Sequence, residues 1–360
     1  MLTPSGNHST NVHRNYSSFL EPIQNATQIN GTIYQQQLMV WYGVSMSVCG
    51  LGGAAYILLM GAVWEHWQMS KRKTGRDRSG TRLLIVHATA VEMVMCCINH
   101  PISFTQILYA ENSVTPTACF FIQAPFAIFR TAGYYSLAFL AINRLVALCF
   151  PIHFRAYWTK QSLNIIFILV TWLVTAANFV PLIIGRELRF EMIPPTNVCA
   201  IKPRTPEARK IHQTLVSHLP LALVWSIYAL MFGFVAMQKL SGQINQTSAS
   251  YRRSLQLTLV LLVSSLWHCV CFYPQPLLMV FEDRGLARPT PETALWLRFV
   301  FLLGYGGNPV IFFTMNQEYR SMLKRWISSI RDLKFRDFGV KVNPNIYTTT
   351  IRSVQDGTLI

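Results

Sequence analysis

The chain has 360 residues, of which 51% are hydrophobic and only 13% are charged, and its formal net charge is +16. Soluble domains carry about 25% charged residues, so this composition excludes an ordinary soluble domain and indicates a membrane protein. The excess of positive charge does not indicate a nucleic-acid-binding protein, because no zinc spacing or other nucleic-acid signature accompanies it, and lysine and arginine collect on the cytoplasmic loops of membrane proteins.

The first 37 residues are polar and contain four glycosylation sequons, at Asn7, Asn15, Asn25 and Asn30. A sequon accepts a glycan only in a secreted or lumenal segment, so we expect residues 1–37 to form an extracellular, glycosylated segment. This segment has no apolar core of the kind that a signal peptide needs. The first apolar span is therefore expected to direct membrane insertion itself.

Seven long apolar stretches follow, at 38–64, 82–109, 116–149, 162–184, 212–238, 253–281 and 292–315. A helix of about 20 apolar residues crosses the ~30 Å hydrocarbon layer. Because lipid offers no hydrogen-bond partner to the backbone, each stretch must be helical. The sequence predicts an all-α membrane protein, with one seven-helix transmembrane domain over residues 38–315.

Basic residues set the expected orientation. Five follow the first span (Lys71, Arg72, Lys73, Arg76 and Arg78), and many more follow the seventh. The loop 185–211 is an exception, with six basic and three acidic residues. Because the first loop usually dominates, we expect the N-terminus outside and the protein in the plasma membrane.

An amphipathic segment follows the seventh span, at residues 316–330. Its apolar residues recur every three or four positions between basic ones: Tyr319, Met322, Leu323, Trp326, Ile327 and Ile330. This spacing predicts a helix on the inner membrane surface. The remaining residues, 331–360, are polar and are expected to form a cytoplasmic tail.

Eight cysteines are present, and two of them fall on the expected outer side. Cys119 begins the third span and Cys199 lies in the long loop before the fifth. Both face an oxidising compartment and can pair. The other six lie in or at the ends of spans, where cysteine usually acts as a small apolar residue.

Several spans carry short motifs in a fixed order: Asn143-Arg144-Leu145, 25 residues after Cys119; Pro220 with Tyr228; Cys271-Phe272-Tyr273-Pro274; and Asn308-Pro309-x-x-Phe312. Together these resemble the motifs of rhodopsin-like (class A) G-protein-coupled receptors over residues 38–330. The sequence departs from the family's usual residues at six positions: Ala54, Glu92, Asn143, Leu145, Phe272 and Phe312. These departures suggest a divergent branch, similar to some invertebrate chemoreceptors.

The resemblance implies a function and a set of partners. An extracellular small molecule or peptide would bind among the outer halves of the spans, and a heterotrimeric G protein would bind the inner face. Arrestin and membrane lipid are further partners that it implies. The Cys119–Cys199 bridge and the switch and coupling residues also follow from it: Asn143, Arg144, Leu145, Tyr228, Phe272, Pro274, Asn308, Pro309 and Phe312.

Arg144 is expected to be held inward at rest and to contact the G protein when the sixth helix moves. The family holds this arginine with a neighbouring aspartate, whereas Asn143 offers only a neutral hydrogen bond, about half as strong. The sequence therefore predicts a weak latch and appreciable basal activity.

Glu92 and Arg130 are unusual charges in apolar spans, where an unpaired charge costs ~2.5–3.5 kcal/mol or more. Two interpretations stay open. The first is an internal salt bridge between them. The second is that Arg130, with Arg298, binds an anionic group of the ligand. Glu92 also stands at the family's sodium site, although Ala54 and the longer acid argue against sodium there.

Other ligand-pocket candidates follow from the family's register alone: Gln123, Phe126, His212, Phe272, Gln275 and Met279. The rival class is a membrane transporter or channel that uses Glu92 and Arg130 as an ion or anion path, against which stands the lack of an internal repeat. No metal-ligand spacing, nucleophilic triad or phosphate-binding glycine loop is present. We therefore expect no enzyme activity, no cofactor and no metal.

Overall fold

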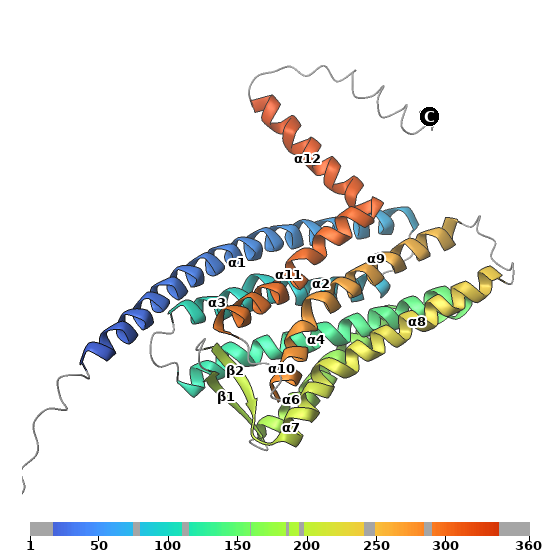
Figure 1. The fold of residues 1–360 in the computed structure, drawn as a ribbon. Helices are drawn as coiled ribbons and strands as arrows, with labels where there is room; N and C mark the ends of the chain where they lie inside the picture. The colour runs from blue at the N-terminus through green and yellow to red at the C-terminus, as the bar shows by residue number, and fades with distance from the viewer. Residues whose placement is uncertain are drawn as a thin grey trace, which may run out of the picture.

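The computed structural model describes residues 17–74, 80–109, 115–158, 160–184, 187–193, 198–240, 249–283 and 290–337. The helices run as a bundle of long, roughly aligned rods, with a small β-hairpin at one end (Figure 1). The elements, in chain order, are α1 (Ser17–Thr74), α2 (Gly80–Val94), η1 (Met95–Asn99), α3 (His100–Tyr109), α4 (Pro116–Cys149), α5 (Pro151–His153), η2 (Phe154–Trp158), α6 (Gln161–Ile184), β1 (Leu188–Ile193), β2 (Val198–Pro203), α7 (Pro206–Gln213), η3 (Thr214–His218), α8 (Leu219–Leu240), α9 (Ala249–Phe272), α10 (Pro274–Asp283), α11 (Pro291–Met315) and α12 (Gln317–Asp337).

Seven spans within the described residues are long and apolar enough to cross a membrane, which confirms the predicted fold class. They are Gln35–Glu65, Arg82–Tyr109, Pro116–Cys149, Gln161–Val180, Pro206–Met237, Leu255–Leu278 and Pro291–Met315. The largest difference from expectation is at the fifth, which begins at Pro206 instead of residue 212.

The N-terminal segment differs from expectation, because α1 already begins at Ser17 and continues without a break into the first span. Part of the segment expected to precede the bundle is therefore helical. Of the four sequons, Asn25 and Asn30 lie on this helix, whereas Asn7 and Asn15 fall outside the described residues.

Three spans depart from a regular α-helix next to a proline. The π-helical turn η1 comes just before Pro101, and η3 comes just before Pro220. The sixth span is broken at Tyr273, so that α10 starts at Pro274. Proline lacks the backbone N–H and its ring crowds the preceding turn, so the helix must widen, kink or break there.

The outer loop folds as a β-hairpin that is fixed to the third span. Strands β1 and β2 pair antiparallel, with Met192 opposite Cys199. Cys199 forms a disulfide with Cys119 at the start of α4, with a Cα–Cα distance of 5.3 Å. The expected pairing is confirmed, and it holds the hairpin against the end of the bundle at which α4 begins.

The surface helix α12 packs through one face. Tyr319 and Met322 are buried, whereas Arg320 and Lys324 are exposed. Trp326 Nε1–H donates to Glu65 Oε2 of α1 at 2.6 Å. The amphipathic pattern thus anchors α12 to the end of the first span.

Candidate ligand pocket and switch core

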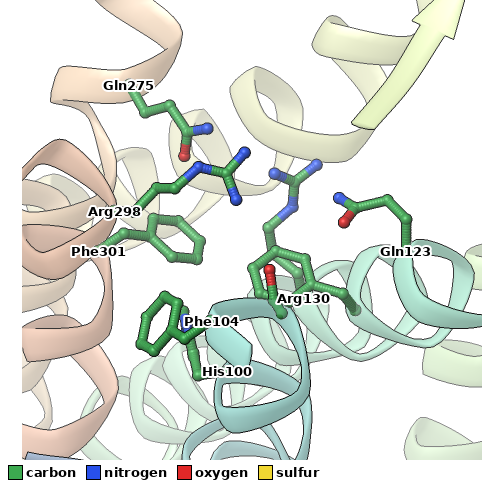
Figure 2. A pocket seen from close by; sticks show the side chains of 9 residues that line it. His100, Phe104, Gln123, Arg130, Gln275, Arg298 and Phe301 are labelled. Atoms are coloured by element: carbon green, nitrogen blue, oxygen red, sulfur yellow. The ribbon is translucent and has the colours of Figure 1, made fainter. Parts of the chain in front are cut away.

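A small pocket lies between the third, sixth and seventh spans and α3, with a cavity volume of about 30 Å³. It is lined by His100, Ser103, Phe104, Gln123, Phe126, Arg130, Gln275, Arg298 and Phe301 (Figure 2). One water needs about 10–15 Å³ by this measure, so the space suits a small group and not a large ligand.

Helical spacing brings these residues to one place. Gln123, Phe126 and Arg130 follow one another at intervals of three and four on α4, so they share a face. Arg298 and Phe301 have the same relation on α11. Five of the predicted pocket residues therefore meet in this cavity: Gln123, Phe126, Arg130, Gln275 and Arg298.

Three predicted pocket residues do not line the cavity or cannot be placed. His212 is buried against Phe179, with ring centroids 5.6 Å apart. Phe272 is buried deeper in the bundle, and the side chain of Met279 falls outside the described part of the structure. The family register predicted which face of each helix these residues lie on, but not how deep in the bundle they lie or which side chains they pack against.

The two pocket arginines face each other. Figure 2 shows the guanidinium groups of Arg130 and Arg298 pointing toward one another, with the carboxamides of Gln123 and Gln275 beside them. Arg130 Nε is buried without a hydrogen-bond partner. Among the described residues, no carboxylate forms an ion pair with either arginine, so this region has a local excess of positive charge.

His100 was not predicted as a pocket residue. It is 1% exposed, and neither ring nitrogen has a hydrogen-bond partner. Aromatic rings surround it, with centroids 5.1 Å away at Phe126, 5.2 Å at Phe104 and 5.5 Å at Tyr305. A sequence signal was available in the spacing of His100, Ser103 and Phe104, which places all three on one helix face.

Glu92 lies apart from this pocket, in a separate polar network. Its Oε2 accepts hydrogen bonds from Asn308 Nδ2 and from the Tyr56 hydroxyl, the latter at 3.0 Å. Its Oε1 lies 3.2 Å from His268 Nε2. No ion pair joins Glu92 to Arg130 in the described structure, so the salt-bridge interpretation, and the grouping of these two as one buried site, is wrong.

The second ring nitrogen of His268 shows which tautomer the imidazole adopts. His268 Nδ1 lies 2.8 Å from the carbonyl oxygen of Ser264, which can only accept, so Nδ1 carries a proton. Nε2 lies close to the carboxyl oxygen of Glu92, but the two groups are not aligned well enough to form a hydrogen bond.

Asn308 extends the same network. Ser264 Oγ–H donates to Asn308 Oδ1 at 2.6 Å, while the Asn308 amide donates to Glu92. The Tyr56 hydroxyl also lies 2.8 Å from the carbonyl oxygen of Tyr305. The network therefore joins the first, second, sixth and seventh spans at the centre of the bundle.

Phe272 links this network to the pocket. Its ring centroid lies 4.5 Å from Phe301 and 4.9 Å from His268. A Cβ atom at Gly304 would overlap the Phe272 ring, so glycine is what allows the ring to lie there. A change at the pocket can thus reach the polar network through one aromatic contact.

At the inner end, Arg144 is 5% exposed, and its Nε and Nη2 have no hydrogen-bond partner. The phenols of Tyr228 and Tyr319 are its nearby electrostatic partners. Asn143 is fully buried, Leu145 is partly buried, and Phe312 lies in the inner apolar cluster with Tyr228. The guanidinium is therefore buried without an acidic partner among the described residues.

Comparison with known proteins decides the family. The family model described as "7 transmembrane receptor (rhodopsin family)" matches residues 67–311. The chain belongs to this family. It is thus a G-protein-coupled receptor and a multi-pass membrane protein, in a family of receptors and not of enzymes.

The receptor is also similar to a solved structure, the crystal structure of squid rhodopsin. The TM-score is 0.65 at 14% sequence identity, and the match covers 81% of this chain and 87% of that chain. This likeness supports the seven-helix fold alone. No curated protein matches the receptor sequence.

The arrangement in the receptor suits binding and switching. A pocket with two arginines lies next to a central polar network, to which Phe272 connects it, and Arg144 lies further along α4. The sequence indicated only an interior histidine at His268, one turn before Phe272 on α9, and did not predict its contact with Glu92.

Proposed function

We propose that the receptor lies in the plasma membrane with its N-terminus outside, binds an extracellular ligand in the pocket, and activates a heterotrimeric G protein through Arg144. The observation that carries this proposal is the buried Arg144, whose Nε and Nη2 have no hydrogen-bond partner. Such a group gains interactions when the inner face opens and a partner approaches, which is what a coupling residue needs.

The break at Tyr273 supports the proposed motion. The inner part of the sixth span, α9, ends just before this break, and Pro274 then starts α10. A break of this kind provides a place where one half of a helix can move relative to the other. A ligand that binds the opened state more tightly shifts the population toward it. Arrestin would compete for the same opened face.

The geometry of the site does not support the alternative hypothesis of a transporter or channel. Glu92 is held by Tyr56, Asn308 and His268 in a closed network, and Arg130 faces a different cavity. An ion path through both residues would need them to share one passage. Uptake or current carried by the purified protein in vesicles would nevertheless favour that reading.

Guanine-nucleotide exchange tests the proposed activity. The receptor is placed in lipid nanodiscs with purified heterotrimers of each main class, and exchange is compared for the wild type and Arg144→Ala. We expect the wild type to accelerate exchange on at least one heterotrimer. Acceleration that is equal in Arg144→Ala would contradict the assignment of Arg144.

Orientation is tested separately on intact cells. An epitope tag at the N-terminus should bind antibody without permeabilisation, and a glycosidase should increase the gel mobility of the wild type. Replacing Asn7, Asn15, Asn25 and Asn30 by Gln should abolish that shift. A tag that is reached only after permeabilisation would reverse the proposed orientation.

A further inference from the structure

We propose that the ligand of this receptor is a carboxylate, held between Arg130 and Arg298. The inference rests on the proposed function, because it names the chemical class that the same pocket recognises. Four features carry it: the facing guanidinium groups, the lack of a carboxylate paired with them among the described residues, the unpartnered His100, and the aromatic wall of the cavity.

The two guanidinium groups form the positive side of the site. Arg130 comes from α4 and Arg298 from α11, and both line the cavity with their charged groups directed toward each other (Figure 2). Like charges at short range repel each other, and more strongly where water is partly excluded. An anion placed between them turns this repulsion into two attractive contacts.

The acids whose side chains the structure describes at this end of the bundle do not pair with the two arginines. Glu191 forms its ion pair with Lys202, at 2.6 Å, and both Glu207 and Glu292 are exposed at the surface. Glu187, beside strand β1, has no ion pair with either arginine in the described structure. The pocket therefore keeps an unbalanced positive charge, which is costly unless a ligand or water compensates it.

His100 supplies an independent sign of an unfilled polar site. It lines the cavity, is 1% exposed, and leaves both ring nitrogens without a partner. Buried polar groups in proteins are almost always hydrogen-bonded, and each exception requires a reason. A carboxylate in the cavity offers an acceptor for an imidazole N–H, and the two arginines would hold it there.

The shape of the cavity favours a carboxylate over larger anions. A planar carboxylate matches the fork of a guanidinium and accepts two parallel hydrogen bonds from it. The cavity volume of about 30 Å³ leaves room for such a head group and little more. Phe104, Phe126 and Phe301 form the apolar wall next to the head group, so an aromatic or aliphatic body would contact them where it leaves the cavity.

Thermal unfolding of the purified full-length receptor in nanodiscs tests the inference directly. The probes are benzoate, phenylacetate and 3-phenylpropanoate at millimolar concentrations, each compared with its neutral primary amide. A ligand that binds only the folded state raises the unfolding temperature by mass action. We expect at least one carboxylate to stabilise the receptor and its matched amide to have no effect.

Variants identify the site. Arg298→Gln and Arg130→Gln should each weaken the effective carboxylate by about tenfold or more, because each loses a charge-assisted hydrogen bond. Arg298→Lys keeps the charge but not the fork, so it should retain part of the binding. Arg189→Gln, at an exposed arginine of the outer hairpin, is the matched control and should bind as the wild type does.

The outcomes separate this inference from the proposed function. Stabilisation by no carboxylate, equal stabilisation by acid and amide, or full binding by both glutamine variants overturns the carboxylate site. Stronger stabilisation by phenyl phosphate or benzenesulfonate than by every carboxylate overturns the choice of anion. A carboxylate that binds through both arginines but leaves nucleotide exchange unchanged supports the site and contradicts the proposed signalling role.

Discussion

His268 faces Glu92 at the centre of the bundle, with Nε2 3.2 Å from Oε1, and both side chains are almost completely buried. The contact joins α2 to α9, the inner part of the sixth span. The contact provides a link between two spans without an added ion. The link must weaken if α9 moves, so it is part of what holds the resting state.

Replacing His268 tests the strength of that link. His268→Phe removes one of the three side chains that contact the buried Glu92 carboxyl group, which is expected to lower the free energy of unfolding by about 1–3 kcal/mol. The unfolding temperature in nanodiscs measures the loss. Glu92→Gln in the same chain removes the unpaired charge, so the double variant should lose less than the sum of the two single changes. Strictly additive losses would mean that the two residues do not interact.

Sodium should not stabilise the wild-type receptor. His268 already contacts the Glu92 carboxyl group, and Tyr56 and Asn308 occupy its other oxygen. Exchange of potassium for sodium at constant ionic strength is therefore expected to leave the unfolding temperature unchanged. In His268→Ala the vacated position beside the carboxylate should make the receptor sodium-sensitive. Sodium-dependent stabilisation of the wild type would show that the imidazole does not replace the ion.

Gly304→Ala is expected to be destabilising, because the added methyl group overlaps the Phe272 ring. Overpacking of this kind costs about 1–3 kcal/mol, measured as a lower unfolding temperature. Phe272→Leu in the same chain should restore part of the loss. Gly43→Ala is the matched control, since a Cβ there meets nothing within 4 Å. An equal loss of stability at both glycines would show that the contact with Phe272 is not the cause.

Asn143→Asp is expected to lower basal signalling. The carboxylate would give Arg144 the charged partner that Asn143 cannot provide, and a charge-assisted hydrogen bond is about twice as strong as a neutral one. Nucleotide exchange without ligand is the measurement, with Asn143→Ala as the control that should not lower it. Unchanged basal exchange in the aspartate variant would refute the weak-latch explanation.

The large features could be predicted from the sequence, because each depends mainly on the properties of single segments of the chain. Length and apolarity predicted the seven spans, and the outer location of Cys119 and Cys199, together with the family resemblance, predicted their disulfide. The register of the resembled family predicted that Gln123, Phe126 and Arg130 face the pocket, and their helical spacing places them on one face. Register along one helix is a property of that helix alone, which is why these predictions agree with the structure.

Contacts between distant helices could not be predicted in the same way. Glu92 and His268 lie 176 positions apart, and the rotation and depth of their helices decide whether they meet. The π-helical turns η1 and η3 interrupt the regular helical register next to His100 and His212, which regular spacing does not anticipate; His100 lines the pocket and His212 does not. The helical start at Ser17 was missed because its polar residues gave no apolar period to read.

The central claim is that Arg144 transmits the state of the bundle to a G protein, and nucleotide exchange without added ligand measures it most directly. Lys324→Ala, at an exposed cation of the inner surface helix, controls for the loss of positive charge, and unfolding temperatures confirm that each variant is folded. We predict that the wild type and Lys324→Ala accelerate exchange, whereas folded Arg144→Ala falls to the rate without receptor. Exchange by Arg144→Ala at the wild-type rate would contradict the account.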